Sequence, residues 1–386
     1  MDARSLRALL RERRTSNAHI DRSGVWRYRE FLPVVDAGAI VTLRENDVPI
    51  YEARGGAAYA RGNRMTYLHL GMNPTGSFKD AGMTAAMTYA AAGGAQLAVC
   101  ASTGNTAASM AAYAARAGVR AIVLVPSTGI SASKVAQTLD YGATVFGIDG
   151  DFDSALETVR RLDPRRVAIV NSINPYRIEG QKTAAFVLLE QRDWRVPDWF
   201  VLPGGNLGNT SAFGKGFREA LALGLIDRLP RIAVVQAAGA APFAQLFRDG
   251  TDMVPVKAET TATAIKIGAP ASWRKALGEV RRSNGTVISV TDEEIADARA
   301  IIGREGIGCE PASAASLAGA RILIDNGTIA ADDDVVLVLT GHVLKDTAYA
   351  ARYHESGAAF ANAIIPTKDE ADLFARIDAL AAQSVG

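Results

Sequence analysis

Short apolar runs alternate with segments of helix length from Ala95 onward, and this alternation constrains the fold more than any other feature of the chain. Such runs, bounded by turn residues, are typical of strands that are buried on both faces of a sheet. They are Leu97–Cys100, Ala121–Val125, Val145–Ile148, Val167–Val170, Phe200–Leu202, Ile232–Val235 and Val335–Leu339. Helices are expected after Asn105, over Ser133–Tyr141, Phe152–Leu162 and Gly180–Gln191, and after Asn209. The pattern predicts an α/β fold with mostly parallel, twisted sheets flanked by helices.

Charge and composition argue against several classes of function. The 386 residues carry 42 Lys and Arg against 41 Asp and Glu, and a net charge of +1 indicates neither a nucleic-acid nor a membrane-surface partner. Cys100 and Cys309 can pair only once and the four histidines are scattered, so the sequence predicts no disulfide framework and no metal site. No apolar run approaches the roughly 18 residues of a membrane span. We therefore expect a soluble, cytoplasmic protein.

A polar turn, Asn73–Asp80, delivers Lys79 to the start of an apolar stretch. Lysine is unusual in the first turn of a helix, because its charge opposes the helix dipole there. Burial and a field of the same sign should both disfavour the ammonium form. Since Schiff-base chemistry requires a neutral amine, Lys79 is the leading candidate for a catalytic residue. The competing interpretation is an ordinary surface lysine that follows a turn.

Three strand-to-helix turns carry further candidates. The first contains Ser102, Thr103 and Thr106, whose hydroxyls and free N–H groups suit a carboxylate, although an ordinary helix cap explains them equally simply. The second, Gly204–Thr210, has glycines that let successive N–H groups cradle a phosphate. It matches neither a dinucleotide fingerprint nor a P-loop. The third turn is Asn171–Arg177.

In that third turn, Arg177 can bind a second phosphate in a bidentate manner, with Asn171 and Ser172 as further donors. The alternative is a capped loop with a surface arginine.

Two more segments lie where ligands bind in open α/β sheets. Cys309–Ala315 begins a helix with proline in its first turn and small residues that allow a flat ring to pack closely. Thr340 follows the apolar run Val335–Leu339 and places a hydroxyl at a strand end.

Together these segments, over about residues 25–350, resemble the threonine synthase family, which comprises pyridoxal-phosphate enzymes of fold type II. The resemblance implies two domains, each with a mostly parallel sheet. The two domains are a large cofactor-binding domain of residues 25–82 and 166–386 and a small mobile α/β domain of residues 83–165. Residues 1–24, which are polar and rich in arginine, are expected to form an N-terminal surface arm or an oligomer contact. The resemblance also implies a homodimer, for which the arm is a candidate contact.

The resemblance further assigns roles to residues. Lys79 would bond covalently to pyridoxal 5'-phosphate, with Phe78 beside it, and Asn105 would bind the ring hydroxyl. Thr340 would face the ring nitrogen. The cofactor phosphate would lie on Gly205, Asn206, Leu207, Gly208 and Asn209. The substrate carboxylate would lie on Ser102, Thr103 and Thr106, and the substrate phosphate on Asn171, Ser172 and Arg177.

The expected reaction is that of a lyase in threonine biosynthesis, in which O-phospho-L-homoserine and water give L-threonine and phosphate. Three departures from the family pattern bear on substrate choice. Arg44–Ile50 stands in place of Gly-Glu-Gly-x-Thr-Pro-Leu, Ala81 in place of a larger residue, and Val343 in place of glycine. The alternatives are a serine or threonine dehydratase, a β-replacement enzyme acting on phosphoserine or another activated amino acid, and a non-catalytic ligand-binding regulator.

Overall fold

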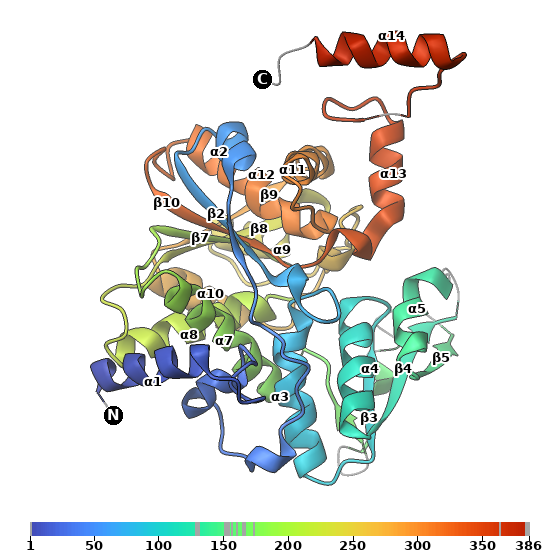
Figure 1. Cartoon of the computed structure of the whole chain (residues 1–386). Coiled ribbons are helices and arrows are strands. Elements are labelled where there is room, and N and C mark those ends of the chain that lie inside the picture. Colours follow the sequence, from blue (N-terminus) through green and yellow to red (C-terminus); the bar gives the residue numbers. More distant parts are fainter. Residues whose placement is uncertain are drawn as a thin grey trace. The chain divides into compact units, whose positions relative to one another are not determined.

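The computed structural model describes residues 2–127, 132–149, 155, 157–159, 161–163, 167–172, 174–362 and 364–382. Contacts between residues divide the chain into a large unit, Met1–Asp346, and a small unit, Thr347–Gly386. The large unit contains both sheets and all the candidate site residues (Figure 1). The division into domains that the resemblance implies, with its small mobile domain, stays a prediction.

The larger sheet has six strands in the order β1-β2-β10-β7-β8-β9. The strands are β1 (Ile50–Glu52), β2 (Arg64–His69), β7 (Trp199–Pro203), β8 (Arg231–Ala237), β9 (Thr286–Val290) and β10 (Asp334–Leu339). All neighbours are parallel except β1, which runs antiparallel to β2. Because strands from both ends of the chain meet at the centre, the carboxyl end of β10 lies between those of β2 and β7.

Helices cover both faces of this sheet because alternate residues of each strand point to opposite sides. Phe200, Val234 and Val336 pack in one cluster, whereas Val201, Val235 and Val335 pack in the other. The first cluster includes residues of α7 (Pro175–Gln191), α8 (Gly208–Ala222), α9 (Pro242–Asp249) and α10 (Trp273–Arg282). The second includes residues of α2 (Arg54–Ala60), α11 (Asp292–Arg304) and α12 (Pro311–Asp325). Figure 1 shows α7, α8 and α10 on one side of the strands and α2, α11 and α12 on the other.

The smaller sheet has four parallel strands in the order β5-β4-β3-β6. They are β3 (Leu97–Ala101), β4 (Arg120–Pro126), β5 (Thr144–Ile148) and β6 (Ala168–Ile169). The helices α3 (Lys79–Ala92), α4 (Asn105–Ala117) and α5 (Ala132–Asp140) belong to this part of the chain, and residues of all three join its core cluster. Short 3₁₀ helices span Trp26–Phe31, Ala37–Ala39, Leu70–Met72, Ala238–Ala240, Thr263–Ile265 and Val343–Asp346.

Helix α3 also packs closely on α7 of the larger layer, and glycine makes this contact possible. A Cβ atom on Gly180 would lie 2.0 Å from the Ala81 carbonyl oxygen, a distance that no side chain tolerates. The small residue at Ala81, a departure from the family pattern, lies in this contact and is buried. The two helices that begin with Lys79 and carry Arg177 are therefore held at a fixed separation.

Most elements expected from the sequence are confirmed. All seven apolar runs overlap strands, helices follow Asn105 and Asn209, and helices cover most of Ser133–Tyr141 and all of Gly180–Gln191. Of the expected helix over Phe152–Leu162, residues 155 and 157–159 are helical, whereas residues 152–154, 156 and 160 lie outside the described ranges. The sequence did not predict three strands, β1, β2 and β9. They are short or mix polar with apolar residues, so they lack the continuous apolar pattern of the others.

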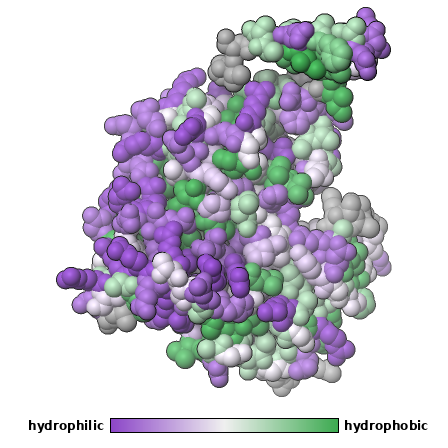
Figure 2. Space-filling view, viewed as in Figure 1, coloured by the Kyte–Doolittle hydropathy of each residue, from purple (hydrophilic) through white to green (hydrophobic). Residues whose placement is uncertain are grey.

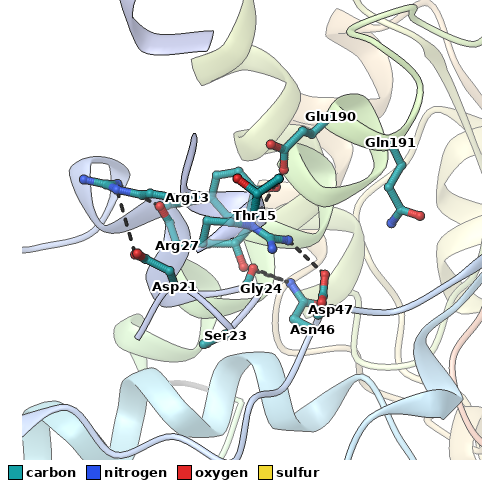
Figure 3. Close-up of polar contacts among 12 residues, drawn as sticks. Arg13, Thr15, Asp21, Ser23, Gly24, Arg27, Asn46, Asp47, Glu190 and Gln191 are labelled. Carbon is teal, nitrogen blue, oxygen red and sulfur yellow. Dashed lines mark hydrogen bonds and ion pairs between the residues drawn. The ribbon is translucent and has the colours of Figure 1, made fainter. Parts of the chain in front are cut away.

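The N-terminal segment, expected to form a surface arm, folds into α1 (Ala3–Thr15) with Leu6 and Leu10 buried in the core of the larger layer. Hydrophilic side chains cover the face of the molecule on which α1 lies (Figure 2). Beneath it, Arg27 pairs with Asp47 at 3.0 Å and approaches Glu190 at 3.7 Å (Figure 3). These contacts fasten the N-terminal segment to the end of α7.

The small unit contains α13 (Thr347–Glu355) and α14 (Glu370–Ala381). Helix α14 exposes the apolar side chains of Leu373, Phe374, Ile377 and Leu380. Figure 2 shows green, hydrophobic surface on this helix. In the part of the chain that the structure describes, no helix is both long and apolar enough to cross a membrane.

The segment Arg44–Ile50 has backbone conformations that suit glycine, although it lacks the glycines of the family pattern. Arg44 and Asn46 adopt left-handed φ angles of 63° and 65°. Asn46 is held by its side-chain amide, which donates to the Gly24 carbonyl at 3.2 Å and to the Thr183 hydroxyl at 3.0 Å. Its backbone N–H donates to the Asn73 side chain at 2.6 Å, so the segment supports the start of the lysine turn.

Replacing Arg44 by glycine should raise the free energy of unfolding by about 1 kcal/mol, because glycine relieves the left-handed strain. Urea denaturation of the cofactor-free protein measures the change. Arg44→Ala is the matched control and should bring no gain, since alanine keeps the strain. Asn46→Gly should instead lower the stability, because two buried hydrogen bonds are lost. Equal stability of the glycine and alanine variants at position 44 would contradict the argument.

Candidate active site

Lys79 is the first residue of α3, and a clip of backbone hydrogen bonds fixes its turn to the end of β10. The Phe78 N–H donates to the Thr340 carbonyl and the His342 N–H donates to the Gly76 carbonyl, both at 2.9 Å. Ser77 and Gly341 form an isolated antiparallel bridge between the two segments. The predicted helix start is confirmed, and the clip brings Lys79 next to Thr340.

Asp80 anchors the same turn from inside. Its buried carboxylate accepts from the Thr75 N–H at 2.7 Å, the Thr75 hydroxyl at 2.5 Å and the Ser109 hydroxyl of α4 at 2.6 Å. Burial raises the pKa of Asp80 to about 6, although these hydrogen bonds act in the opposite direction. The residue after the lysine therefore ties α3, α4 and the turn together.

The amine of Lys79 has the electrostatic environment of a neutral base. Burial and, to a smaller extent, the nearby Arg177 cation lower its pKa to about 7, while Glu310 acts in the opposite direction. The amine nitrogen lies 4.0 Å from the centre of the Phe78 ring. The sequence argument invoked burial and the helix dipole, and the structure adds Arg177 as a specific charge that disfavours the ammonium form.

A cluster of polar side chains lies at the carboxyl end of β10, next to the clip. The Glu310 carboxylate accepts from the Asn105 amide at 2.9 Å and from the Thr340 hydroxyl at 3.1 Å. The Ser313 hydroxyl lies 2.9 Å from the Thr340 hydroxyl. The sequence predicted Asn105 and Thr340 here but missed Glu310 and Ser313. The proline in the first turn of α12 signalled the helix start, but nothing in the pattern indicated which way these side chains point.

The glycine-rich turn between β7 and α8 has the form of an anion cradle. Leu207, which precedes the helix, adopts a left-handed φ of 62°. The Asn206 side chain accepts from the Ala271 N–H at 2.9 Å, which fixes the turn from outside. Among the described residues, no acceptor is found for the side-chain N–H groups of Asn209 or for the hydroxyl of Thr210, although all are buried. Free donors at a helix N-terminus suit a phosphate group.

Arg177 lies in the first turn of α7 and is only 4% exposed. One guanidinium nitrogen donates to the Val170 carbonyl at 3.2 Å, but its Nε has no partner within the described part of the chain. Burial lowers the pKa of Arg177 to about 10. A buried cation with spare donors is costly unless an anion compensates it, so this residue marks a second anion site.

Two other residues were predicted for that site, and the side chain of one of them, Asn171, is hydrogen-bonded to the backbone. Its side-chain amide exchanges hydrogen bonds with the Ala101 N–H and carbonyl, at 3.2 and 3.1 Å, and so ties the segment after β6 to the end of β3. Ser172 is partly buried. Of the three, Arg177 is the cation, and its Nε has no partner among the described residues.

The residues predicted for a carboxylate lie at the start of α4. Ser102 accepts from the Gly104 N–H at 3.2 Å, which shapes the turn before Asn105. Thr103 and Thr106 are partly buried. The first N–H groups of α4 have no partners within the helix and can bind an anion.

The candidate site thus includes residues from the N-termini of four helices, α3, α4, α7 and α8. Residues from α3 and α4 meet Glu310 and the end of β10, and Arg177 of α7 lies close enough to Lys79 to shift its pKa. Ile178 of α7 is the nearest neighbour of a Cβ atom built on Gly208, at 3.9 Å, so the start of α8 is adjacent. The arrangement can bind a ligand that carries several negative charges next to a neutral amine.

Comparisons with known proteins agree with this geometry. A model of the family described as pyridoxal-phosphate dependent enzymes matches residues 41–341. A threonine synthase from Methanocaldococcus jannaschii is 46% identical over 86% of this chain and 83% of its own length. One from Synechocystis sp. is 49% identical over 83% of this chain and 82% of its own. The solved structure of a fungal L-serine ammonia-lyase from Rhizomucor miehei superposes with a TM-score of 0.70 at 21% identity, covering 80% of this chain and 98% of that one.

The depressed pKa of Lys79 predicts how its reactivity depends on pH. In the cofactor-free protein, reductive methylation of Lys79, quantified by mass spectrometry, should rise with a midpoint near pH 7 rather than near the ordinary 10.5. Arg177→Met should raise that midpoint by about 1 unit, because a repelling cation is removed. Arg116→Met, at an exposed position in the last turn of α4, is the control. A wild-type midpoint near 10.5 would show that Lys79 is an ordinary lysine.

Proposed function

The chain belongs to the family of pyridoxal-phosphate-dependent enzymes, and we propose that it is a threonine synthase that converts O-phospho-L-homoserine and water into L-threonine and phosphate. The relatives named threonine synthase support the assignment, because they match most of the chain at nearly half identity. The observation in the site that carries the proposal is Arg177, a buried cation close to the amine of Lys79 whose Nε has no partner among the residues that the structure describes.

The residues of the site fit the cofactor. The buried donors of Asn209 and Thr210 and the turn Gly205–Gly208 form a cradle for its phosphate. Lys79 offers an amine of low pKa for its aldehyde. Asn105 would bind the ring hydroxyl and Thr340 would face the ring nitrogen. Bound pyridoxal phosphate withdraws electrons from the amino-acid substrate and so stabilises negative charge on its carbon atoms.

Lys79 would carry protons between the substrate carbons. With a pKa of about 7, its amine can both accept and release a proton near neutral pH, as a general base and acid must. At the position proposed to face the ring nitrogen, Thr340 carries a neutral hydroxyl rather than a carboxylate. Water enters as a reactant, and closure of residues 83–165 over the substrate would control when it does.

The substrate is proposed to be a phosphorylated amino acid because the site has separate places for two further anions. Arg177, with Asn171 and Ser172 close to it in the chain, would hold the phosphate that leaves. The start of α4, with Ser102, Thr103 and Thr106, would hold the carboxylate. A dehydratase acting on serine or threonine has no use for a buried arginine at the first of these places.

The proposal extends to location and assembly. Cys100 and Cys309 are both buried and unpaired, as is usual in the reducing cytoplasm, and this supports a cytoplasmic enzyme. A homodimer is proposed from the resemblance to the family.

A direct test is to add pyridoxal phosphate to the purified protein, reduce with borohydride, and locate the pyridoxyl group by mass spectrometry. It should be on Lys79, and Lys79→Arg should abolish the label. Turnover is then measured with O-phospho-L-homoserine, phosphoserine, serine and threonine in parallel. Phosphate release from O-phospho-L-homoserine, with threonine as the product, is the expected result. Turnover of serine or threonine alone would overturn the assignment in favour of a dehydratase.

Arg177 separates the phosphorylated substrate from the others. Arg177→Met should lower kcat/KM for O-phospho-L-homoserine about 100-fold or more, because a buried, charge-assisted contact is lost. Inorganic phosphate should compete with the substrate in the wild-type enzyme and much less in the variant. Arg116→Met, at the surface, should retain wild-type kinetics. Unchanged kcat/KM in Arg177→Met would mean that no phosphate is bound there.

A further inference from the structure

Glu310 is a buried carboxylate that is not among the residues proposed above to bind the cofactor or the substrate. Its side chain lies at the start of α12, and it is 4% exposed. Both of its oxygens are used, one by the Asn105 amide at 2.9 Å and the other by the Thr340 hydroxyl at 3.1 Å. These two partners are the residues proposed to contact the cofactor ring. Glu310 therefore links α4 of the smaller layer to the end of β10 in the larger one.

The hydrogen bonds around Ser313 determine where the Thr340 hydroxyl donates. The Ser313 oxygen accepts from the N–H groups of Thr340 at 2.8 Å and Gly341 at 3.0 Å. A hydroxyl oxygen accepts two hydrogen bonds, so the Ser313 hydrogen must be donated, and its neighbour is the Thr340 oxygen at 2.9 Å. The Thr340 hydrogen then points to Glu310, which as a carboxylate accepts it.

Glu310 also fixes the Asn105 amide. A carboxylate accepts hydrogen bonds and donates none, so Asn105 must turn its NH₂ group, and not its oxygen, towards Glu310. The second hydrogen of that group is then available for another acceptor. A negatively charged ring hydroxyl group would be such an acceptor.

We propose that Glu310 is a positioning residue for the cofactor ring. Glu310 sets the direction in which the Thr340 hydroxyl donates, and it sets the orientation of the Asn105 amide. It also places a negative charge close to Lys79. This inference rests on the proposed function, because it assumes that pyridoxal phosphate occupies the site. It adds to that function a residue that reaches the cofactor through two others.

The charges around Glu310 come from three elements. Lys79 of α3 and Lys345 of the 3₁₀ helix Val343–Asp346 are the cations that act on it, and Arg177 of α7 acts on Lys79 in turn. The adjacent Cys309 thiol stays neutral, because burial raises its pKa to about 12. Burial raises the pKa of Glu310, while its two hydrogen bonds and the two lysines oppose that shift. Its charge in turn favours the protonated form of the Lys79 nitrogen.

The test compares Glu310→Gln with the wild-type protein in the binding of pyridoxal phosphate. Equilibrium dialysis gives the Kd, and the visible absorption band of the bound cofactor is recorded as a function of pH. We expect a Kd about tenfold higher or more, because the amide cannot accept from both partners. The midpoint of the spectral change should move to lower pH by about 1 unit, since the negative charge beside the Lys79 nitrogen is gone.

Glu190→Gln is the matched control, since Glu190 is another buried carboxylate with a hydroxyl partner, Tyr28, at 2.5 Å. It lies about 20 Å along α7 from Arg177, so both the Kd and the spectral midpoint should stay at wild-type values. Thermal unfolding of each cofactor-free variant shows whether it folds.

Glu310→Asp supplies a second variant. It keeps the charge but is too short to reach both partners, so the Kd should rise while the spectral midpoint stays near that of the wild type. Wild-type Kd and midpoint in Glu310→Gln would overturn the inference. If that variant does not fold, an unchanged Kd in Glu310→Asp does so instead. A wild-type protein that develops no visible band with pyridoxal phosphate would overturn the proposed function, before any variant is compared.

Discussion

The site depends on the clip that joins the lysine turn to the end of β10. Lys79 belongs to a helix of the smaller layer, whereas Thr340 ends a strand of the larger sheet, and two backbone hydrogen bonds of 2.9 Å fix one to the other. These backbone bonds do not use the side chain of Lys79, so its amine stays free for chemistry. The close contact of Gly180 with Ala81 fixes the same helix from the opposite side. The lysine is thus held by the two layers together.

The sequence predicted the fold well because its strands are buried on both faces. Val335–Leu339 and Phe200–Leu202 lie at the centre of the sheet, and their continuous apolar residues predict strands. The edge strand β1 and its neighbour β2 could not be predicted in this way, because β1 has only three residues and β2 mixes Thr66 and His69 with its apolar residues. The burial of α1 was equally hidden, since Leu6 and Leu10 stand among arginines whose number indicated a surface.

For the site, the sequence predicted residues whose type reveals their chemistry. A lysine after a polar turn, glycines before a helix and an arginine in a capped turn all indicate a function in isolation. Glu310 and Ser313 did not, because a glutamate before a proline is an ordinary helix start. Their roles come from side-chain direction, which depends on how α12 packs against β10. Thr210 was missed for a related reason, because its hydroxyl matters only once burial removes it from water.

Three of the seven buried side-chain atoms that lack a hydrogen-bond partner among the described residues lie at the site, and Asn46 and Thr66 elsewhere each contribute one of the others. Arg177, Asn209 and Thr210 each bury a donor without a partner among the described residues, and all three donors lie in the first turns of α7 and α8. Each such group lowers the stability of the fold by about 1–3 kcal/mol when it is left unpaired, so the loss has to be compensated elsewhere. Arg27 and Glu190 also bury unpaired atoms, but their opposite charges lie 3.7 Å apart and compensate each other. Among the described residues, no carboxylate pairs with the free donors of Arg177, Asn209 and Thr210, so we expect anionic ligands to bind them. Their binding should therefore stabilise the fold as well as prepare the reaction.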